Sequence, residues 1–344
     1  MTPILWRSLL CSWSGWGRAS WKLAEAVERA GQRVAFDTSI GADEKFGAIP
    51  DFVLARRARA GAPFALRLQC ASPIIPAPAG SVVFTMWDST GIQPAWADSI
   101  NACKALVVPS AFNAATFSAG GVGVPIAVCP LGADTSVFRP SARSRRDRFT
   151  VGMAGRWHLG GTRKGHVEGM LAFRDAFGDR DDVCLEVKCW PDDPVPDFGD
   201  PRIRLVRDPM TDAELAAWYG SLDLYLDPSL GEGWGLQTHE AMCCGTPVAT
   251  ALWSGRAEFC HGGNVVPLAY DLAPGPPPYH GLGVMAYPRH DSMVRALRGA
   301  ESRRESLPEL GAIGGRTASM YTWDAAARRL LEILGQLTTG VGNA

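Results

Sequence analysis

The chain has 344 residues, more than one ordinary hydrophobic core accommodates, and this length predicts two domains. Hydrophobic residues make up 47% of it and charged residues 20%, which excludes an intrinsically disordered protein. The formal net charge of -1 gives no overall attraction to nucleic acid or to an anionic membrane. Basic runs at 55–60 and 142–148 are interpreted as solvated faces or linker.

The 9 cysteines contain no C-x-x-C pair, so we predict neither a zinc site nor a secreted disulfide framework. The N-terminus lacks the apolar region and cleavage site of a signal peptide. No stretch of about 18 apolar residues occurs, so no membrane span is expected. We therefore expect a cytoplasmic protein with reduced thiols, an expectation that leaves peripheral membrane association open.

The first half of the chain has the pattern of a parallel α/β unit. A Gly/Ser loop at 11–17 precedes a helical pattern over 18–31, and a strand is predicted at 33–39. This strand–loop–helix–strand order is typical of a parallel sheet. Further strands are predicted at 81–87, 104–110 and 125–132, with helices between them.

The pattern starts again after a polar, basic segment near 141–148, which is the best candidate linker. The sequence thus predicts two Rossmann-like, doubly wound α/β domains facing a cleft, in which ligands bind. The predicted domains are 1–145, joined by a C-terminal helix at about 322–340, and 146–321. Within the second domain, strands are predicted at 148–157, 183–190, 223–229 and 247–252, and helices at 165–178, 212–222, 236–245 and 291–301.

Two glutamates stand in the glycine-rich stretch GEGWGLQTHEAMCCGTPVA, at 231–249. Glu232 falls in a turn after a predicted strand, and Glu240 in the helix that follows. The glycines allow a ligand close to the backbone, and the helix N-terminus suits a phosphate. Carboxylates beside a phosphate site suit the hydroxyls of a nucleotide sugar. The alternative makes Glu232 a helix-terminal charge and Glu240 a surface residue.

A second cluster of candidate residues lies in GMAGRWHLGGTRKGH, at 152–166. Arg156, Arg163 and Lys164 follow the first strand of the second domain. An arginine fork and a lysine point charge both suit phosphate oxygens and would stabilise a leaving diphosphate. The alternative is a set of solvated loop cations.

The stretch SWSGWGRAS, at 12–20, carries Gly15 and Gly17 in the first strand–helix turn. It lacks the third glycine of the G-x-G-x-x-G dinucleotide fingerprint. A dehydrogenase is therefore the least favoured of the enzyme classes.

Taken together, these motifs resemble the retaining glycosyltransferases of glycosyltransferase family 4, which have the GT-B fold. The resemblance covers most of the chain. It is carried by SGWGRAS, PLGADTSVFRP, GRWHLGGTRKG, the E-x7-E stretch with the following GTPV, and the terminal YTWDAAARRLLEIL.

The resemblance implies a metal-independent hexosyltransferase without a cofactor, with an acceptor-binding first domain and a donor-binding second domain. It implies that Glu232, Arg156 and Lys164 are catalytic, with Glu232 at the transferred sugar. Retention would proceed by front-face attack, with the leaving phosphate as base. The implied donor-binding residues are Gly15, Gly17, Gly233, Trp234, Gly235, Leu236, Glu240 at the ribose, and Arg207 near the nucleobase.

One feature departs from the family pattern. Many members carry a donor-contacting histidine in the first domain, whereas the first histidine here is His158. Trp87 or Asp88 is the candidate to form the wall of the donor-sugar site in its place, although Asp88 equally suits a helix cap. Trp16 is a further candidate wall residue, because aromatic faces suit sugars; core packing is the alternative. His158, His166 and His239 are interpreted as bystanders, since they do not have metal-ligand spacing.

The acceptor is left open by the sequence. A saccharide or lipid-linked glycan is favoured, and hydroxymethylated pyrimidine in DNA is the alternative, with the two basic runs as phosphate contacts. Two other classes share the architecture: a nucleotide-sugar epimerase and a binding protein with a decayed active site.

Overall fold

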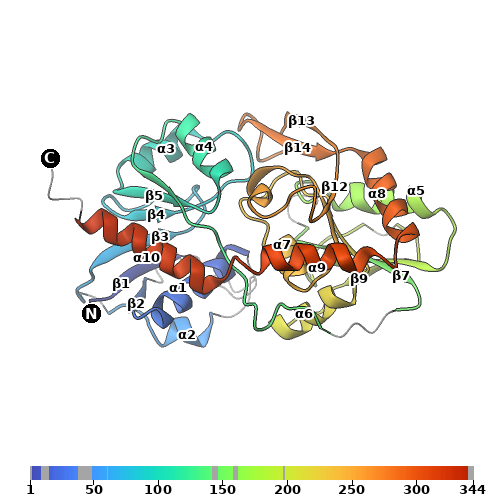
Figure 1. The fold of residues 1–344 in the computed structure, drawn as a ribbon. Helices are drawn as coiled ribbons and strands as arrows, with labels where there is room; N and C mark the ends of the chain where they lie inside the picture. Colours follow the sequence, from blue (N-terminus) through green and yellow to red (C-terminus); the bar gives the residue numbers. More distant parts are fainter. Residues whose placement is uncertain are drawn as a thin grey trace. The chain divides into compact units, whose positions relative to one another are not determined.

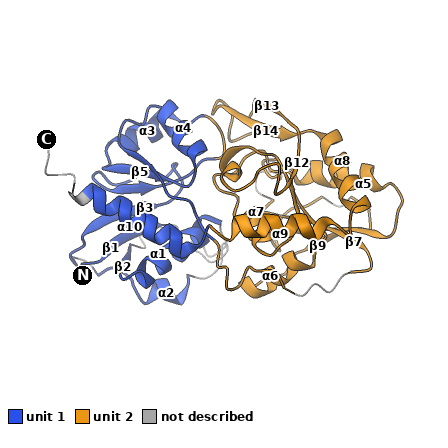
Figure 2. Cartoon of the chain, viewed as in Figure 1, with its two compact units in different colours: residues 1–87, 91–132, 321–344 blue, residues 88–90, 133–320 orange. Residues whose placement is uncertain are grey.

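The computed structural model describes residues 2–8, 15–37, 49–59, 61–141, 146–157, 162–196 and 198–339. The chain forms two compact units, coloured separately in Figure 2. Unit 1 comprises 1–87, 91–132 and 321–344, and unit 2 comprises 88–90 and 133–320. The short segment 88–90 thus belongs to unit 2, although both of its flanking segments belong to unit 1.

Unit 1 is built on a six-stranded parallel sheet with the order β2-β1-β3-β4-β5-β6. The strands are β1 (Ile4–Ser8), β2 (Val34–Asp37), β3 (Leu66–Cys70), β4 (Val82–Phe84), β5 (Ala105–Val108) and β6 (Ile126–Val128). The helices are α1 (Gly15–Arg29), α2 (Asp51–Leu54), α3 (Pro94–Asn101), α4 (Ala111–Ala119) and α10 (Trp323–Thr339). Continuous apolar strands such as β5, which is buried throughout, are typical of a sheet covered on both faces.

The last helix of the chain, α10, packs on α1 in unit 1 (Figure 1). Its buried residues recur at helical spacing: Trp323, Ala327, Leu330 and Leu334. Beyond β2, a single parallel bridge joins Phe36 to Arg57, so a short segment continues the sheet past its last full strand.

Unit 2 contains a second six-stranded parallel sheet, with the order β12-β11-β10-β7-β8-β9. Its strands are β7 (Phe149–Ala154), β8 (Val183–Lys188), β9 (Ile203–Val206), β10 (Leu224–Asp227), β11 (Val248–Thr250) and β12 (Val266–Pro267). Its helices are α5 (His166–Phe177), α6 (Asp212–Ser221), α7 (Leu236–Cys243), α8 (His290–Ser302) and α9 (Leu307–Ala318). A two-stranded antiparallel hairpin, β13 (Tyr270–Pro274) and β14 (Val284–Pro288), is added to this sheet unit.

The strand order of unit 2 reverses between β7 and β10. The chain runs from β7 outwards through β8 and β9, then returns beside β7 as β10 and runs outwards on the other side. In open α/β sheets, ligands bind outside the carboxyl ends of the strands at such a switch point. The loops that follow β7 and β10 are therefore the place to examine for a site.

The core of unit 2 lies between its sheet and the helices α5 and α8. Phe149, Val151 and Met153 of β7 pack with Phe173 of α5 and Leu297 of α8. Helix α6 begins with a capping box, in which Thr211 and Glu214 satisfy each other's backbone amides. The apolar periodicity of the residues in this core is the feature from which helices and strands of unit 2 were predicted.

The predicted fold class, two doubly wound α/β units, is confirmed. The elements that were not predicted from the sequence are the strands β3, β9 and β12, the β13–β14 hairpin, and the helices α2 and α9. The proline-rich stretch 274–278 begins at the last residue of β13 and continues into the loop before β14. Helix α1 begins at Gly15, earlier than predicted, so Gly15 and Gly17 form its first turn instead of the preceding loop. No helix in the described parts of the chain is long and apolar enough to cross a bilayer.

Candidate functional site

The loops after β7 and β10 meet at the switch point of unit 2. Gly165 ends the β7–α5 loop with a left-handed φ of 63°, and a Cβ there would overlap the carbonyl oxygen of Pro228, just after β10. Only glycine combines this conformation with this close approach. The backbone of Leu230 also donates to the Arg163 carbonyl oxygen at 2.8 Å, so the two loops are joined directly.

The centre of the site is a buried carboxylate held by two cations. The Lys164 Nζ donates to Glu232 Oε1 at 2.6 Å, and the Arg163 Nη1 donates to the same oxygen at 3.0 Å. Glu232 is 8% exposed and Lys164 9%. Burial alone would raise the pKa of Glu232, but Lys164 and then Arg163 lower it below its ordinary value. The carboxylate is therefore ionised at neutral pH.

Asp88 holds the same loop from the segment 88–90. Its Oδ1 accepts the Gly233 amide at 2.8 Å, its Oδ2 accepts the Tyr279 hydroxyl at 2.8 Å, and Arg163 Nε lies 3.5 Å from Oδ2. Asp88 was predicted as a sugar wall or a helix cap. The structure shows its carboxylate bonded to the Glu232 loop, an arrangement that orients both Arg163 and the backbone beside Glu232.

A second buried ion pair supports this loop. Asp227, the last residue of β10, accepts Arg256 Nη1 at 2.7 Å and the Thr238 hydroxyl at 2.6 Å on its Oδ2. Burial opposes the charge on Asp227, but Arg256, the Thr238 hydroxyl and Lys164 together lower the pKa of Asp227 well below the ordinary value. Arg256 also donates to the Ser229 carbonyl oxygen at 2.8 Å. Charges that are buried and paired in this way fix the path of the β10–α7 loop.

The start of α7 carries the remaining residues of the E-x7-E stretch. Leu236 is half-buried at the first position of α7. The Trp234 side chain is buried against Phe259 and His239, so only the backbone of Trp234 can line a ligand site. Glu240 is 3% exposed, which excludes its interpretation as a surface residue.

Arg156 and Arg207 gather around the loop after β8. The Arg156 guanidinium lies over the Trp190 ring, 4.4 Å from its centroid, and its Nε is 4.0 Å from Asp193 Oδ1. Asp193 Oδ2 in turn accepts the amides of Trp157 and Trp190, at 3.0 and 2.8 Å. Arg207 Nη1 donates to the carbonyl oxygens of Trp190, Pro191 and Asp193. Arg207, which was predicted to lie near a nucleobase, thus stabilises the conformation of this loop through hydrogen bonds to its backbone.

The described histidines near the site are buried and neutral. His166 stacks on Trp157, with ring centroids 5.2 Å apart. Burial, with a smaller effect of Lys164, lowers the pKa of His166 to about 3, and burial lowers that of His239 to about 4. His158 lies outside the described residues. Within the described parts of the chain, no group of three or more His, Cys, Asp or Glu residues is suited to hold a metal ion.

The other predicted residues belong to unit 1. Gly15, Trp16 and Gly17 form the first turn of α1, where Trp16 is half-buried. Trp87 is 7% exposed, and its ring packs edge-on against Trp96, with centroids 4.7 Å apart. Its backbone pairs with the Asn113 side-chain amide through two hydrogen bonds. Trp87 is therefore part of the packing of unit 1.

Sequence reasoning missed three residues of this site: Asp227, Arg256 and Tyr279. Each acts through a long-range contact, such as the one between Tyr279 and Asp88, 191 positions apart. One signal was available for Arg256, which lies in the SGRAEF stretch after the GTPV motif. An arginine among otherwise small and apolar residues predicts a buried, paired charge.

The fold is that of known GT-B proteins. The chain superimposes on sucrose-phosphate synthase from Thermosynechococcus elongatus with a TM-score of 0.73 and 16% identity, covering 99% of this chain and 100% of the other. For Anabaena HepE in complex with UDP and glucose, the TM-score is 0.67 at 13% identity, covering 98% and 100%. For WaaG, a glycosyltransferase involved in lipopolysaccharide biosynthesis, it is 0.67 at 14% identity, covering 96% and 99%.

Parts of the chain are similar in sequence to known glycosyltransferases. Residues 199–272 match the family described as glycosyl transferases group 1. The D-inositol 3-phosphate glycosyltransferase of Paenarthrobacter aurescens is 26% identical over 239 residues, 63% of this chain and 53% of that protein. That of Xylanimonas cellulosilytica is 34% identical over 136 residues, 39% of this chain and 28% of that protein. The matched segments thus span about half the length of these relatives, or less. Over these segments the chain is similar to the group 1 glycosyltransferases.

Proposed function

We propose that the protein is a retaining, metal-independent glycosyltransferase that moves a sugar from a nucleotide-diphosphate sugar to a hydroxyl acceptor. The observation that carries this proposal is the cluster of Glu232, Lys164 and Arg163 at the switch point of unit 2. A buried carboxylate beside two cations offers an acceptor for sugar hydroxyls next to positive charge for a diphosphate.

In the proposed reaction, the bond between the anomeric carbon and the diphosphate oxygen breaks, and the electron pair leaves with the nucleoside diphosphate. The acceptor hydroxyl oxygen bonds to the same face of the anomeric carbon, and its proton passes to the leaving phosphate. Lys164 and Arg156 stabilise the charge that develops on the diphosphate. Glu232 Oε1 is occupied by Lys164 and Arg163, which leaves Oε2 to accept from the transferred sugar.

For the donor, UDP sugars are the first candidates. HepE was solved with UDP and glucose, and the pneumococcal O-GlcNAc transferase GtfA with UDP and GlcNAc. We propose that Glu240, four residues after the start of α7, receives the ribose hydroxyls, because it lies near the helix N-terminus that suits the donor diphosphate.

For the acceptor, we propose a saccharide or a lipid-linked glycan. Because the matched relatives are named D-inositol 3-phosphate glycosyltransferase, an acceptor assay should also include a phosphorylated polyol. Hydroxymethylated DNA is the remaining alternative, and an acceptor panel separates it from the saccharides.

The test is transfer and donor hydrolysis by the purified chain with UDP, GDP and ADP sugars, against Glu232→Ala, Lys164→Ala and Arg156→Ala. Arg156→Ala is the cleanest variant, because Arg156 stands outside the buried Glu232–Lys164 pair. We expect it to lower kcat/KM by roughly a hundredfold, the loss typical of one donor to a developing charge. Arg328→Ala, an exposed arginine on α10, is the matched control and should retain full activity. Undiminished turnover in all three site variants would refute the proposal, and a sugar product epimerised without acceptor would reassign the enzyme class.

A further inference from the structure

A pocket of about 870 Å³ is lined entirely by residues of unit 1. Its lining includes Pro3 just before β1, Arg33 just before β2 and Phe64 shortly before β3. The pocket therefore extends along β2, from Arg33 before its amino end to Arg59, which follows the residues paired with Phe36 near its carboxyl end. It is a different site from the Glu232 cluster, whose residues belong to unit 2.

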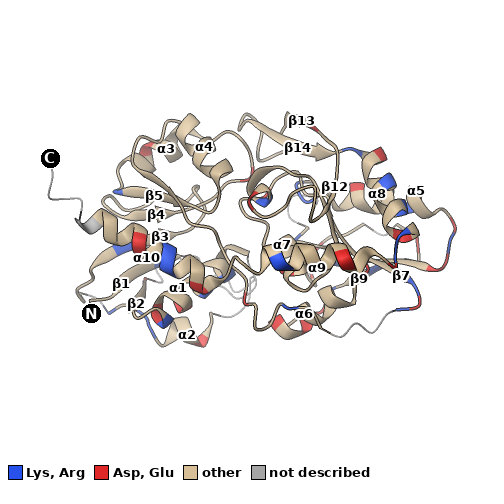
Figure 3. Ribbon diagram, in the orientation of Figure 1, with Lys and Arg blue, Asp and Glu red and all other residues tan. Residues whose placement is uncertain are grey.

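The charged lining of the pocket is strongly one-sided. Four arginines, Arg33, Arg56, Arg57 and Arg59, line it with a single carboxylate, Glu28. Elsewhere, basic and acidic residues are interspersed over both units (Figure 3), and the whole chain has a formal net charge of -1. This local excess of positive charge is thus a property of the pocket and not of the surface as a whole.

Both carboxylate oxygens of Glu28 already accept hydrogen bonds within the protein. Its Oε2 accepts Arg56 Nε, and its Oε1 accepts the Val34 amide at 3.2 Å. Arg56 is further held by the Phe52 carbonyl oxygen at 3.1 Å and by the Phe52 ring. Among the described residues, none pairs with the guanidinium of Arg33 or Arg59.

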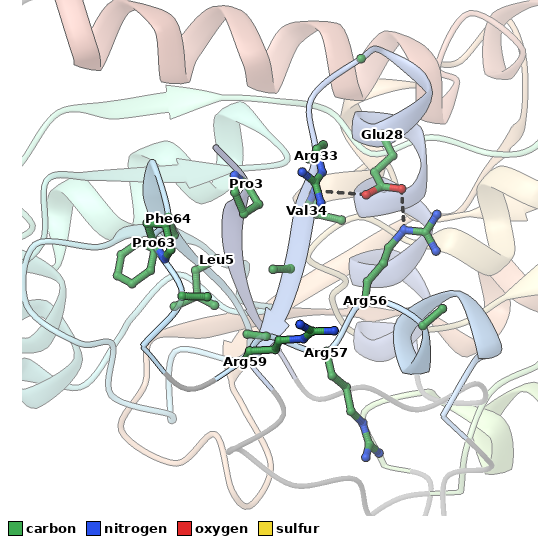
Figure 4. Close-up of a pocket in the computed structure, with 15 residues that line it drawn as sticks. Pro3, Leu5, Glu28, Arg33, Val34, Arg56, Arg57, Arg59, Pro63 and Phe64 are labelled. Carbon is green, nitrogen blue, oxygen red and sulfur yellow. Dashed lines mark hydrogen bonds and ion pairs between the residues drawn. The ribbon is translucent and has the colours of Figure 1, made fainter. Parts of the chain in front are cut away.

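Figure 4 shows these two free arginines on opposite sides of the hollow, with Leu5 and Pro63 on a third side. The Arg57 side chain runs away from them. Apolar walls complete the pocket, and Phe64 remains 42% exposed beside it. The volume lies within the range of small-molecule sites, and the combination of apolar walls with a few placed polar groups is typical of them.

We propose that this pocket binds a phosphate ester, with Arg33 and Arg59 donating to the phosphate from two sides. Arginine forks match phosphate oxygens in bidentate geometry, and the apolar walls receive the carbon skeleton of the ester. The phosphate belongs either to a soluble phosphomonoester or to an anionic phospholipid headgroup. A DNA duplex fits less well, because its phosphates line a convex, extended backbone, whereas these arginines line a hollow.

The experiment uses the full chain and two probes: glycerol 3-phosphate in calorimetry, and vesicles of phosphatidylglycerol mixed with phosphatidylcholine in co-sedimentation. The test variant is Arg33→Ala/Arg59→Ala, and the matched control is Arg57→Ala, from the same basic run but pointing away. Both sets of arginines are at the surface, so folding is checked by thermal unfolding alone. Lys164→Ala as a common background removes phosphate binding at the unit 2 site.

We expect the double variant to weaken binding by at least roughly tenfold, the factor that one charge-assisted hydrogen bond supplies. Arg57→Ala should stay within about twofold of the wild type. Binding of glycerol 3-phosphate alone identifies a soluble ester, and binding of phosphatidylglycerol vesicles alone identifies a headgroup. Equal binding by wild type and double variant, equal loss in Arg57→Ala, or binding of neither probe overturns the proposal. A duplex-DNA gel shift that depends on Arg33 and Arg59, without glycerol 3-phosphate binding, also overturns it.

Discussion

The two arginine-containing sites of the molecule use the same side chain in opposite ways. In unit 2, Arg163 sits at the carboxyl ends of the strands and is engaged by Glu232, Asp88 and the Gly231 carbonyl oxygen. In unit 1, Arg33 before β2 and Arg59 beside the carboxyl end of β2 line a pocket, and no described residue pairs with either guanidinium. The charge of Arg163 is paired within the folded structure, whereas those of Arg33 and Arg59 are exposed at the surface of the protein.

This difference has an energetic consequence. Removing one partner of a buried ion pair leaves the other charge desolvated and unpaired, which costs about 3–5 kcal/mol. Surface substitutions away from such features stay within about 0.5 kcal/mol. Substitutions in unit 2 therefore mix stability with activity, and substitutions in the unit 1 pocket report on binding alone.

The largest effect expected from this contrast is that of Lys164→Met. Glu232 then remains buried with Arg163 as its cation, and we expect the free energy of unfolding to fall by about 3 kcal/mol. Arg59→Met, the counterpart in unit 1, should change it by less than about 0.5 kcal/mol. Urea unfolding followed by tryptophan fluorescence measures both.

The double variant Lys164→Met/Glu232→Gln distinguishes a charge effect from a packing effect. With Glu232 neutralised, no unpaired buried carboxylate remains, so the double variant should be more stable than Lys164→Met alone. Transfer activity should stay lost in both. Strictly additive destabilisation would show that the two side chains are not coupled and would remove the energetic basis of the contrast.

Two glycines with positive φ make a second, smaller comparison. Gly165 of unit 2 has a φ of 63° and lies against Pro228, whereas Gly31 beside the unit 1 pocket has a φ of 94° and open space where a Cβ would point. Gly31→Ala should cost about 1 kcal/mol for the backbone conformation alone. Gly165→Ala should cost about 2–3 kcal/mol, because the β10 loop must also move.

Thermal unfolding and transfer kinetics of both alanine variants check this prediction. Displacement of the β10 loop should lower activity in Gly165→Ala, since Glu232 follows that loop. Gly31→Ala should keep the activity of the wild type. Equal destabilisation by the two substitutions would contradict the close contact between the β7 and β10 loops.

Much of the fold and part of the site could be predicted from sequence, for a physical reason. Carboxyl ends of parallel strands converge on one edge of a sheet, so a motif after β7 and a motif after β10 had to come close. The contact of Lys164 with Glu232 follows from this convergence. Continuous apolar strands and helical periodicity likewise predicted the α/β fold class.

The parts that escaped prediction depend on contacts between distant segments. Asp88 bonds the Gly233 amide 145 positions away, a partnership that no local pattern indicates. The basic run at 55–60 was interpreted as a solvated face, and only the folded chain shows that Arg59 and Arg33 face one hollow while Arg56 is paired. Of the other basic run, residues 142–145 lie outside the described part of the chain.

The smallest of the three effects concerns acid stability, and it belongs to unit 2 alone. All 6 histidines of the chain lie between His158 and His290, so unit 1 has none. Burial, and then Lys164, lowers the pKa of His166 from 6.5 to about 3. Below about pH 6.5 the unfolded chain binds a proton at this position and the folded chain does not, so stability falls as the pH falls, down to about 3.

At pH 5 this difference amounts to about 2 kcal/mol, at about 1.4 kcal/mol for each pH unit. His166→Phe keeps an aromatic ring on Trp157 but cannot take up a proton. Between pH 7 and pH 5 the wild type should therefore lose about 2 kcal/mol more of its unfolding free energy than His166→Phe does. The control is His280→Gln, at an exposed position, which should follow the wild-type curve. His239 contributes equally to all three proteins, so parallel curves for wild type and His166→Phe would mean that His166 takes up its proton in the folded state as readily as in the unfolded chain.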